Sequence, residues 1–365
     1  MGGNFSRGLF LTDDIEVSRH NAVRFPGISP RAYEHPVDRG ALATLRAVPG
    51  FAQVVKAVSG FYAERGERLM ALASGIRVGP KQYPELDKLR NECAETLDLD
   101  RVPNLFVARS PEVNAQTIGM DEPFIVLNTA AVEAMDLASL RFVIGHEMGH
   151  VLSGHAVYRT IMIRLIGLQM SMSWTPVSAI GIRVVIAALR EWYRKAELSC
   201  DRAGLLCSQD PTAALRSQIL VAGGIDPAKI DIPAFLQQAA EYESVDDIRD
   251  SYLKLRYVET MSHPLAVVRA AQLQKWAASE EYRAILAGEY PRRDADAPSS
   301  TWTDDLKSAA KSYKDSWNSS ADPLTKVFSD VGEAVSGAAG KVWSKFGGSG
   351  NGAEDGPEGA PESGK

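Results

Sequence analysis

Apolar residues recur at intervals of three and four along much of this chain, which is the spacing of amphipathic helices. Residues 84–97, for example, place Leu86, Leu89 and Cys93 on one helical face. The predicted helical segments are 41–73, 84–97, 211–221, 233–256 and the stretch from Pro264 to about Ala287.

Between positions 103 and 127 the pattern changes to short apolar or alternating runs. The runs Asn104–Arg109, Val113–Ile118 and Phe124–Leu127 are separated by turn residues such as Ser110-Pro111 and Gly119. This pattern predicts three strands in a small sheet. Together with the helical segments, it predicts a mainly helical α+β fold with a small three- to four-stranded sheet.

Residues 161–189 are the least polar stretch of the chain. The uncharged part from Leu165 to Ile182 is just long enough to span a bilayer. However, Thr175-Pro176 is a typical N-cap and first-turn pair, which would divide the stretch into two helices, the second running to about Leu206. Buried or surface-docked helices are the favoured interpretation, and a membrane span or re-entrant hairpin is the alternative.

The 365 residues exceed what one hydrophobic core usually holds, so we expect one large domain with appendages, or two domains. Residues 1–40 show little periodicity and are predicted to form an extended arm, followed by a domain at 41–290. Residues 291–365 are rich in Ser, Asp, Lys and Gly, which predicts a largely disordered tail. An amphipathic segment near 322–346 is the exception and could fold on a partner or a membrane surface.

The composition excludes several classes of protein. Forty basic and 46 acidic residues give a formal net charge of −6, which argues against a nucleic acid as the main partner. Three cysteines are too few for a disulfide framework, which fits a reducing compartment. The first residues lack the apolar core of a secretory signal, so we expect a cytoplasmic location, with membrane association as the alternative.

The residues that indicate chemistry are His146-Glu147-Met148-Gly149-His150. We expect them on a helix that begins at the N-cap Asp136. Residues four apart share a helical face, so both imidazoles can bind one zinc ion, with Glu147 beside them. A catalytic zinc keeps one position for water and lowers its pKa to about 7. Glu147 can then accept a proton from that water and deliver it to the leaving amine.

Two histidines leave the third ligand open. An extended motif with a third histidine would need glycine at 153 and histidine at 156, but the chain has Ser153 and Ala156. His155 lies one position early and would project from another side of the helix. We therefore expect His155 to be a helix-end or surface histidine rather than a ligand.

A glutamate from a later helix is the other route to a third ligand. Glu197 would bind the zinc, and Asp201, one turn later on the same face, would accept the free N–H of a ligating histidine. Glu191 is the rival ligand, but it lacks an acidic partner four residues later.

Several motifs in this order resemble the M48 metallopeptidases, the gluzincins that include the CAAX prenyl endopeptidase and the HtpX-like heat-shock proteases. They are the run Val113–Gly119, the helix ending in GHEMGHVLSGH, the segment ELSCDRAG at 197–204 and the segment SHPLAVVRAAQL at 262–273. The resemblance covers residues 70–290. It implies a zincin-like domain with the small sheet packed on the HExxH helix.

The resemblance also implies a role for each matching residue. One zinc per chain would be held by His146, His150 and Glu197, with Glu147 as the general base and acid. Asp201 would hydrogen-bond a ligating histidine.

Three further roles follow from the same resemblance. His263 would donate a hydrogen bond to the developing oxyanion, and Arg269 would support the substrate side. Asn114 and Ala115 would lie on an edge strand that pairs with an extended peptide substrate.

The chain departs from the integral-membrane members, because only 161–189 could serve as a span. Prenyl-protein specificity is therefore not expected. The predicted function is a zinc-dependent metalloendopeptidase of the EC 3.4.24 class that acts on extended or unfolded polypeptides through metal-activated water. One alternative is a catalytically idle peptide binder. The other is a membrane-docked quality-control protease anchored by 161–189 or by the amphipathic segment of the tail.

Overall fold

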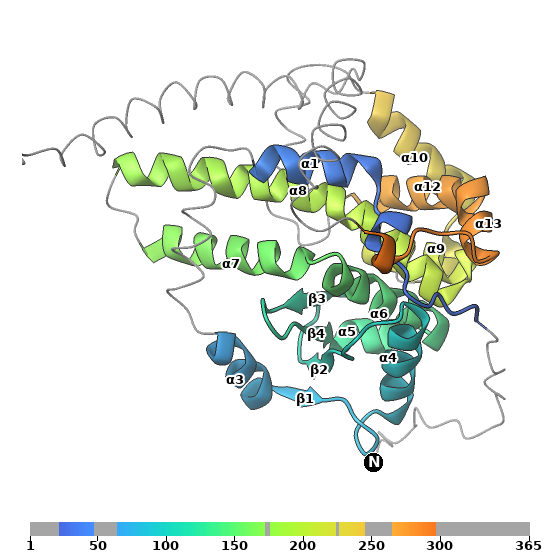
Figure 1. The fold of residues 1–365 in the computed structure, drawn as a ribbon, viewed down its shortest axis with the longest axis horizontal. Coiled ribbons are helices and arrows are strands. Elements are labelled where there is room, and N and C mark those ends of the chain that lie inside the picture. The colour runs from blue at the N-terminus through green and yellow to red at the C-terminus, as the bar shows by residue number, and fades with distance from the viewer. Residues whose placement is uncertain (1–21, 47–63, 172–175, 224–225, 245–264, 297–365) are drawn as a thin grey trace, which may run out of the picture.

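The computed structural model of this chain is mainly helical with one small mixed sheet, which confirms the predicted α+β class (Figure 1). It describes residues 22–46, 64–171, 176–223, 226–244 and 265–296. His263, the second part of the predicted helix 233–256 and the tail from residue 297 lie outside these ranges.

Four strands form the sheet in the order β1-β2-β4-β3. The strands β2 and β4 run parallel, whereas β1 and β3 pair antiparallel with their neighbours. The strand β3 therefore lies at an edge, as expected. The strands are β1 (Gly75–Arg77), β2 (Asn104–Ala108), β3 (Ala115–Ile118) and β4 (Phe124–Asn128). The sequence predicts the last three but not β1, because three residues are too short to show alternation.

Helices cover both faces of the sheet. In β4, Ile125 belongs to the same buried cluster as Ile144 of α6, whereas Phe124 and Val126 pack with Ala71 of α3. This alternation is the two-residue period of a strand. The helices around the sheet include α3 (Glu64–Ser74), α4 (Pro84–Thr96), α5 (Thr129–Ala134) and α6 (Leu137–Leu152).

The helix that carries the HExxH motif begins where the sequence predicts. Asp136 is the N-cap of α6, and its carboxylate accepts a hydrogen bond from the backbone N–H of Ser139. The helix ends at Leu152, because Gly154 takes a positive φ of 69° that most residues avoid. A new helix, α7 (His155–Ser171), starts immediately after this turn.

The helices α6 and α8 (Pro176–Ser208) approach each other closely because α6 presents glycines to α8. A Cβ atom on Gly145 would lie 2.4 Å from Cβ of Cys207, and one on Gly149 would lie 2.7 Å from Cβ of Ala203. Neither distance is compatible with van der Waals packing. The glycines that flank and interrupt the HExxH motif therefore set the spacing between the two helices of the site.

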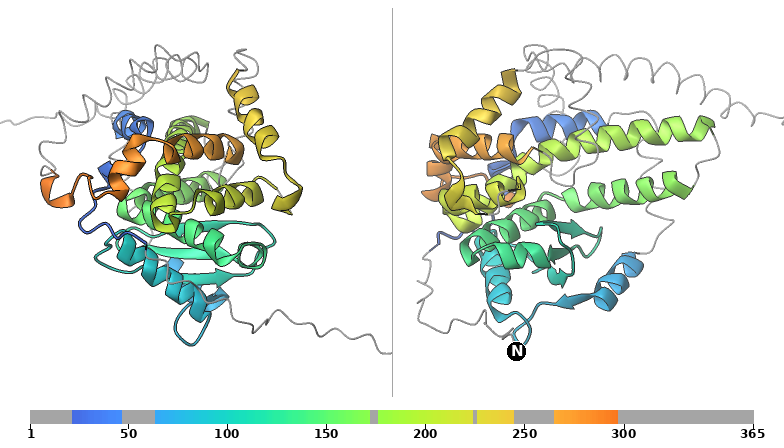
Figure 2. Two further views of the ribbon diagram at one scale, coloured as in Figure 1. Left: turned by 90° about the vertical axis from the view of Figure 1, so that its right-hand side faces the viewer. Right: turned by 180° about the vertical axis from the view of Figure 1, so that it is seen from behind.

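The described residues of the apolar stretch 161–189 lie on two helices, α7 and α8, and α8 begins at Pro176 as predicted. The two helices extend side by side away from the sheet (Figure 2). Ile161 and Leu165 of α7 are buried with Leu189 of α8 and Leu45 of α1 (Pro36–Arg46). Among the helices that the structure describes, none is long and apolar enough to cross a membrane.

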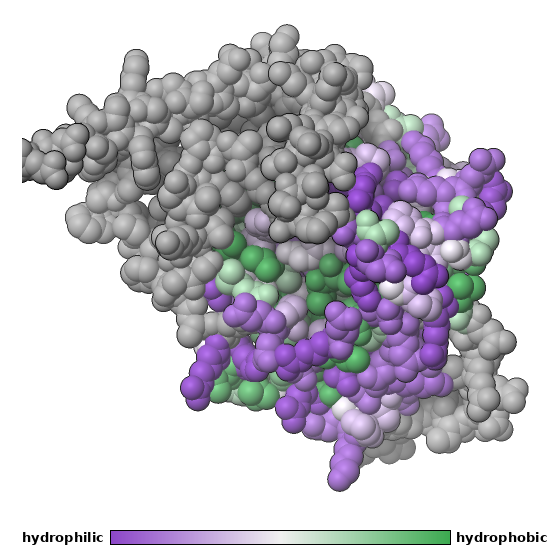
Figure 3. Space-filling model, viewed as in Figure 1, coloured by the Kyte–Doolittle hydropathy of each residue, from purple (hydrophilic) through white to green (hydrophobic). Residues whose placement is uncertain are grey.

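The surface that carries α3 and α7 shows apolar side chains between polar ones (Figure 3). Leu69 and Met70 of α3 and Ile163 of α7 are among the exposed large hydrophobic residues. Met70 and Ile163 line a groove against the outer face of the sheet, together with Phe106 and Ile118.

The predicted extended arm at 1–40 is wrong for residues 22–40. Phe25, Ile28 and Tyr33 are buried in the main core, and α1 begins at Pro36. Ile28 also forms an isolated β-bridge with Arg292, so the first residues after 290 pack against the domain rather than belonging to a tail. The predicted helix 41–73 corresponds to parts of α1 and α3, with 47–63 outside the described residues.

The remaining helices gather beside α8. They are α9 (Pro211–Val221), α10 (Ile232–Ser244), α12 (Ala266–Ala277) and α13 (Glu280–Leu286), with short 3-10 turns η1 (Pro30–Ala32), η2 (Pro227–Lys229) and η3 (Arg293–Ala295). Of these, α9 and α12 contribute side chains to the site.

Candidate metal centre

The helix α6 directs three side chains of the motif into the space between itself, α8 and β3. His146, Glu147 and His150 are all buried, although each carries a group that is charged or strongly polar. Buried groups of this kind are normally compensated by neighbours of matching chemistry. The residues around the three side chains therefore indicate what the site is built to hold.

Glu197 of α8 reaches both histidines. Its Oε1 lies 3.2 Å from Nε2 of His150, and its Oε2 lies 3.6 Å from Nε2 of His146. One ligand atom from each residue can be chosen so that all three lie within 4.8 Å of one another. The ligands of a tetrahedral zinc are about 3.3 Å apart, given metal–ligand distances of about 2.0–2.1 Å. The three residues therefore fit a zinc ion in number, chemistry and spacing.

Asp201 lies one turn after Glu197, and its carboxylate interacts with the side chains of three other residues. Its Oδ1 lies 3.0 Å from Nδ1 of His146 and accepts a hydrogen bond from Nε2 of Gln218 at 2.9 Å. Arg269 donates to both carboxylate oxygens, at 2.6 and 2.8 Å. Burial alone would raise the pKa of Asp201, but Arg269 and His146 lower it below its usual range. The carboxylate is therefore ionised, as a partner of a metal-ligating histidine should be.

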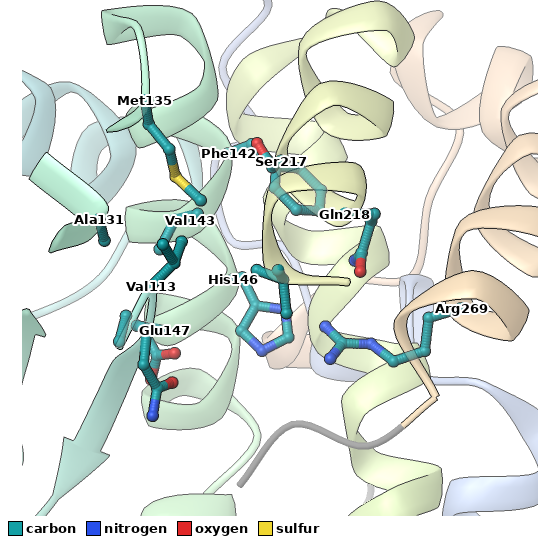
Figure 4. Close-up of a pocket in the computed structure, with 13 residues that line it drawn as sticks. Val113, Ala131, Met135, Phe142, Val143, His146, Glu147, Ser217, Gln218 and Arg269 are labelled. Atoms are coloured by element: carbon teal, nitrogen blue, oxygen red, sulfur yellow. The ribbon is translucent and has the colours of Figure 1, made fainter. Parts of the chain in front are cut away.

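Arg269 lies on α12 and binds the carboxylates of the site. Besides its bonds to Asp201, its Nη1 lies 2.8 Å from Oε2 of Glu197. The sequence-based interpretation placed this residue on the substrate side. The structure places it between two carboxylates and also on the wall of the neighbouring pocket, where Figure 4 shows it beside His146.

Glu147 is oriented by a residue that the sequence analysis did not select. Thr117 of β3 donates a hydrogen bond from Oγ1 to Oε2 of Glu147 at 2.7 Å, and the same Oγ1 lies 3.1 Å from the backbone oxygen of Glu147. Thr117 is fully buried and lies two residues after Ala115. The strand period puts Ala115 and Thr117 on one face, so the alternation of β3 was the signal available in the sequence.

A pocket opens beside His146 and Glu147 (Figure 4). Asn114 and Ala115, which the sequence analysis assigned to substrate binding, lie on its wall at the start of β3. The apolar residues that line it are Val113, Ala131, Met135, Phe142, Val143 and Val221. The structure therefore brings the predicted edge strand, Glu147 and a mostly apolar pocket together.

His150 has different neighbours from His146. Burial lowers the pKa of its imidazole to about 4, so the ring is neutral, as a metal ligand must be. Within the described residues its Nδ1 makes no hydrogen bond. Instead, Tyr193 of α8 stacks on the ring, with centroids 5.4 Å apart and planes within 10°. Tyr193 lies four residues before Glu197 and so on the same helical face, a signal that the sequence analysis did not use.

The sequence analysis expected His155 to lie at a helix end or on the surface. It lies at a helix end but not on the surface. It is the first residue of α7 and is buried, because α6 has already ended at Leu152. Its Nε2 lies 3.3 Å from Oδ2 of Asp38 of α1, and its Nδ1 lies 3.5 Å from Sγ of Cys200. Asp38 also accepts hydrogen bonds from Trp192 and Ser199. The helix α1 therefore contributes Asp38 to the buried residues that pack behind His150.

His150, His155 and Cys200 form a second group whose ligand atoms are close enough to hold an ion. Burial raises the pKa of the Cys200 thiol well above its ordinary value, so metal binding there would require the loss of a tightly held proton. Glu197 instead offers a carboxylate, which is a common ligand of catalytic zinc beside two histidines. The donor chemistry therefore favours the group of His146, His150 and Glu197.

Comparison with known proteins identifies the family of this chain. Residues 80–277, more than half of the chain, match peptidase family M48. Plastoglobule-localized metallopeptidase 48, chloroplastic, of Arabidopsis thaliana is 33% identical over 270 residues, which cover 72% of this chain and 77% of that protein. Human metalloendopeptidase OMA1, mitochondrial, is 28% identical over 130 residues, which cover 31% of this chain and 24% of that protein. No solved structure matches the chain. These similarities show that the chain belongs to peptidase family M48, a family of metallopeptidases.

Proposed function

We propose that this metallopeptidase is a zinc-dependent endopeptidase that holds one zinc ion and cleaves extended or unfolded polypeptides. The observation that carries the proposal is the convergence of His146, His150 and Glu197 within 4.8 Å, directly beside the buried Glu147. The similarity to a human protein named as a metalloendopeptidase supports the endo-acting class.

The proposed chemistry divides between the ion and the residues of the chain. A zinc ion held by His146, His150 and Glu197 would acidify water and polarise the carbonyl of the scissile peptide bond. Glu147 accepts the proton of the attacking water at its carboxylate and later transfers it to the amine nitrogen of the leaving peptide. Thr117 keeps the Glu147 carboxylate in place through the 2.7 Å hydrogen bond. Asp201 fixes the ring of His146 in the orientation that leaves Nε2 toward Glu197.

The position of β3 supports an extended substrate. Asn114 and Ala115 lie at the start of an edge strand, where an extended peptide can add a further strand to the sheet. One substrate side chain would then enter the apolar pocket beside His146 and Glu147. The role proposed for His263, a hydrogen bond to the oxyanion, stays a prediction from the sequence.

The location of the chain is also part of the proposal. Within the described residues the cysteines are free and buried, which fits a reducing compartment such as the cytoplasm. The two relatives are named for the chloroplast plastoglobule and the mitochondrion. Peripheral membrane contact through 161–189 or through the segment near 322–346 therefore stays a proposal beside the cytoplasmic one.

The experiment that tests the function is the substitution Glu147→Gln. It removes the proton acceptor and leaves the three proposed ligands intact, so casein cleavage should fall by about a thousandfold, the effect of losing general acid–base catalysis. The zinc content, measured by mass spectrometry, should not change. The matched control is Glu133→Gln in α5, an exposed glutamate that should leave both properties unchanged.

Two results would contradict the proposal. Casein cleavage by Glu147→Gln at the wild-type rate would show that Glu147 does not have this role. Peptide binding by the wild-type chain without cleavage of any tested polypeptide would favour the idle peptide binder.

A further inference from the structure

Arg159 of α7 is a buried arginine beside the metal centre that the proposed mechanism does not use. Only 5% of its surface is exposed. Its Nη2 donates one long hydrogen bond of 3.4 Å to Oε1 of Gln116, and its guanidinium lies 5.2 Å from the centroid of the Tyr193 ring. Among the residues that the structure describes, its Nη1 has no hydrogen-bond acceptor.

Other buried arginines of the chain are compensated differently. Arg141 pairs with Glu92 at 2.5 Å, and Arg164, five residues after Arg159 on the same helix, pairs with Glu67 at 2.9 Å. In the part of the chain that the structure describes, Arg159 has no carboxylate at ion-pairing distance. Because a buried cation without a counter-charge is costly, its retention here calls for an anionic partner.

The guanidinium is charged. Burial alone would lower its pKa, but Tyr193, Glu147 and Glu197 raise it above its ordinary value. The two carboxylates act through space rather than by contact, and both have other tasks in the proposed mechanism. They therefore keep Arg159 ionised without satisfying its donors.

The position of Arg159 connects it to the substrate. Gln116 lies between Ala115 and Thr117 on β3, the edge strand proposed to pair with an extended peptide. On its other side, Arg159 contacts Tyr193, which stacks on His150. A group that reaches Arg159 along β3 therefore comes from the peptide bound next to the metal centre.

The charges of the site favour an anion at this point. With a divalent ion bound, the positive charge of the ion, Arg159 and Arg269 exceeds by one the negative charge of Glu147, Glu197 and Asp201. The Gln116 amide at 3.4 Å supplies a dipole but no charge. A carboxylate supplies both the missing charge and two oxygens that match the fork of the guanidinium.

We propose that Arg159 binds a carboxylate of the polypeptide substrate and makes the enzyme prefer substrates that carry one close to the scissile bond. The inference rests on the proposed peptidase function. The carboxylate belongs either to an acidic side chain or to the C-terminus of the substrate, because the two present the same group. Arg159 is then a specificity-determining residue, distinct from Arg269, which is already paired with the carboxylates of Asp201 and Glu197.

The test uses the full zinc-loaded chain and sets of peptides that differ in one group. One set exchanges Glu for Gln at each position from three residues before to three after the scissile bond. A second set exchanges the C-terminal acid for an amide. We expect one position, or the C-terminus, at which the carboxylate lowers KM by about tenfold, the effect of one hydrogen bond to a charged group.

The variants assign that preference to Arg159. Arg159→Gln should abolish the difference between acid and neutral peptides, retain zinc and cleave the neutral peptides at a similar rate. Arg159→Lys should restore part of the preference, because it keeps the charge but not the fork. Arg164→Gln removes another buried arginine from the same helix and should keep the full preference.

The outcomes separate this inference from the proposed function. If wild-type enzyme cleaves acid and neutral peptides equally in every set, or if Arg159→Gln keeps the preference, the inference is wrong and the peptidase function stands. Binding of the same labelled peptides to Glu147→Gln, measured by fluorescence anisotropy, tests Arg159 without hydrolysis. If no peptide is cleaved but the acid peptides still bind Glu147→Gln more tightly through Arg159, the proposed function fails and the carboxylate site remains.

Discussion

The two imidazoles that α6 presents to Glu197 are held in different ways. On the side of α9 and α12, Nδ1 of His146 lies 3.0 Å from a carboxylate oxygen of Asp201, which also binds Gln218 and Arg269. On the side of α7, the ring of His150 is covered by an aromatic face and, in the described residues, its Nδ1 has no acceptor.

This difference extends to the arginine on each side. Arg269 donates hydrogen bonds to Asp201 and forms an ion pair with Glu197, whereas Arg159 donates one long hydrogen bond to an amide and faces an aromatic ring. The first side is therefore internally compensated in charge and suited to fix the ligands. On the second side, Arg159 lies next to the edge strand and, within the described residues, has no carboxylate at ion-pairing distance.

The largest effect is expected from Asp201→Asn. The substitution keeps the shape of the side chain but removes the charge that orients His146 and balances Arg269, so the affinity for zinc should fall by about 10–100-fold. Competition with a chromophoric chelator measures it. The control is Asp87→Asn, because Asp87 is also buried and paired, with Arg90, but lies outside the site. An unchanged zinc affinity in Asp201→Asn would show that His146 needs no carboxylate.

A smaller effect is expected from Tyr193→Leu. This variant removes the ring that covers His150. Zinc affinity should fall by about threefold to tenfold, which corresponds to the free energy of one aromatic contact. Tyr193→Phe keeps the ring and should stay close to wild type in the same titration. A loss in Tyr193→Leu as large as that in Asp201→Asn would remove the proposed difference between the two sides.

Asp38→Asn, which acts behind His150 through His155, should change zinc affinity less than the other two substitutions. Its main effect should be on the stability of the fold. Against the effect of burial, His155, Ser199 and Trp192 lower the pKa of Asp38 below 3.8. Also against burial, Asp38 raises the pKa of His155 above 6.5. The lowered carboxyl pKa stabilises the fold above pH 3.8, and the raised imidazole pKa stabilises it below pH 6.5. The ion pair of Asp38 and His155 therefore contributes its full stabilisation of the fold only between pH 3.8 and pH 6.5.

Urea unfolding of the metal-free chain measures this contribution. At pH 5 the free energy of unfolding of Asp38→Asn should be lower than that of wild type by about 3 kcal/mol, the typical cost of breaking a buried pair. The gap should narrow as the pH rises above 6.5 and passes through the raised pKa of His155, because the imidazole then loses its proton and its attraction to Asp38. A gap that is constant from pH 5 to pH 9 would show that His155 is not charged in the folded chain.

The parts of this molecule that the sequence predicts are those that depend on local periodicity. The spacing of His146 and His150 and of Glu197 and Asp201 places each pair on one helical face, and the structure brings the two faces together. The N-cap at Asp136 is local in the same way and is confirmed. Three of the four strands follow from alternation or apolar runs.

Other parts depend on contacts between distant segments, which leave no local pattern. Phe25 and Tyr33 lie in a stretch without periodicity, yet both are in the core because α4 and α6 offer them a surface. The break at Gly154 ends α6 early and turns His155 toward Asp38, a residue more than a hundred positions away. The sequence did not single out Arg159, because a missing ion-pair partner among the described residues becomes visible only in the folded structure.

The central claim is that His146, His150 and Glu197 hold one zinc ion. The most direct test is the zinc content of the purified full chain and of Glu197→Gln, both prepared with added zinc and measured by mass spectrometry. The account predicts about one zinc per wild-type chain and less than about half an equivalent in Glu197→Gln, because the neutral amide is a poor replacement for the carboxylate ligand. A wild-type chain that holds less than about half an equivalent, or a variant that holds as much zinc as wild type, would contradict it.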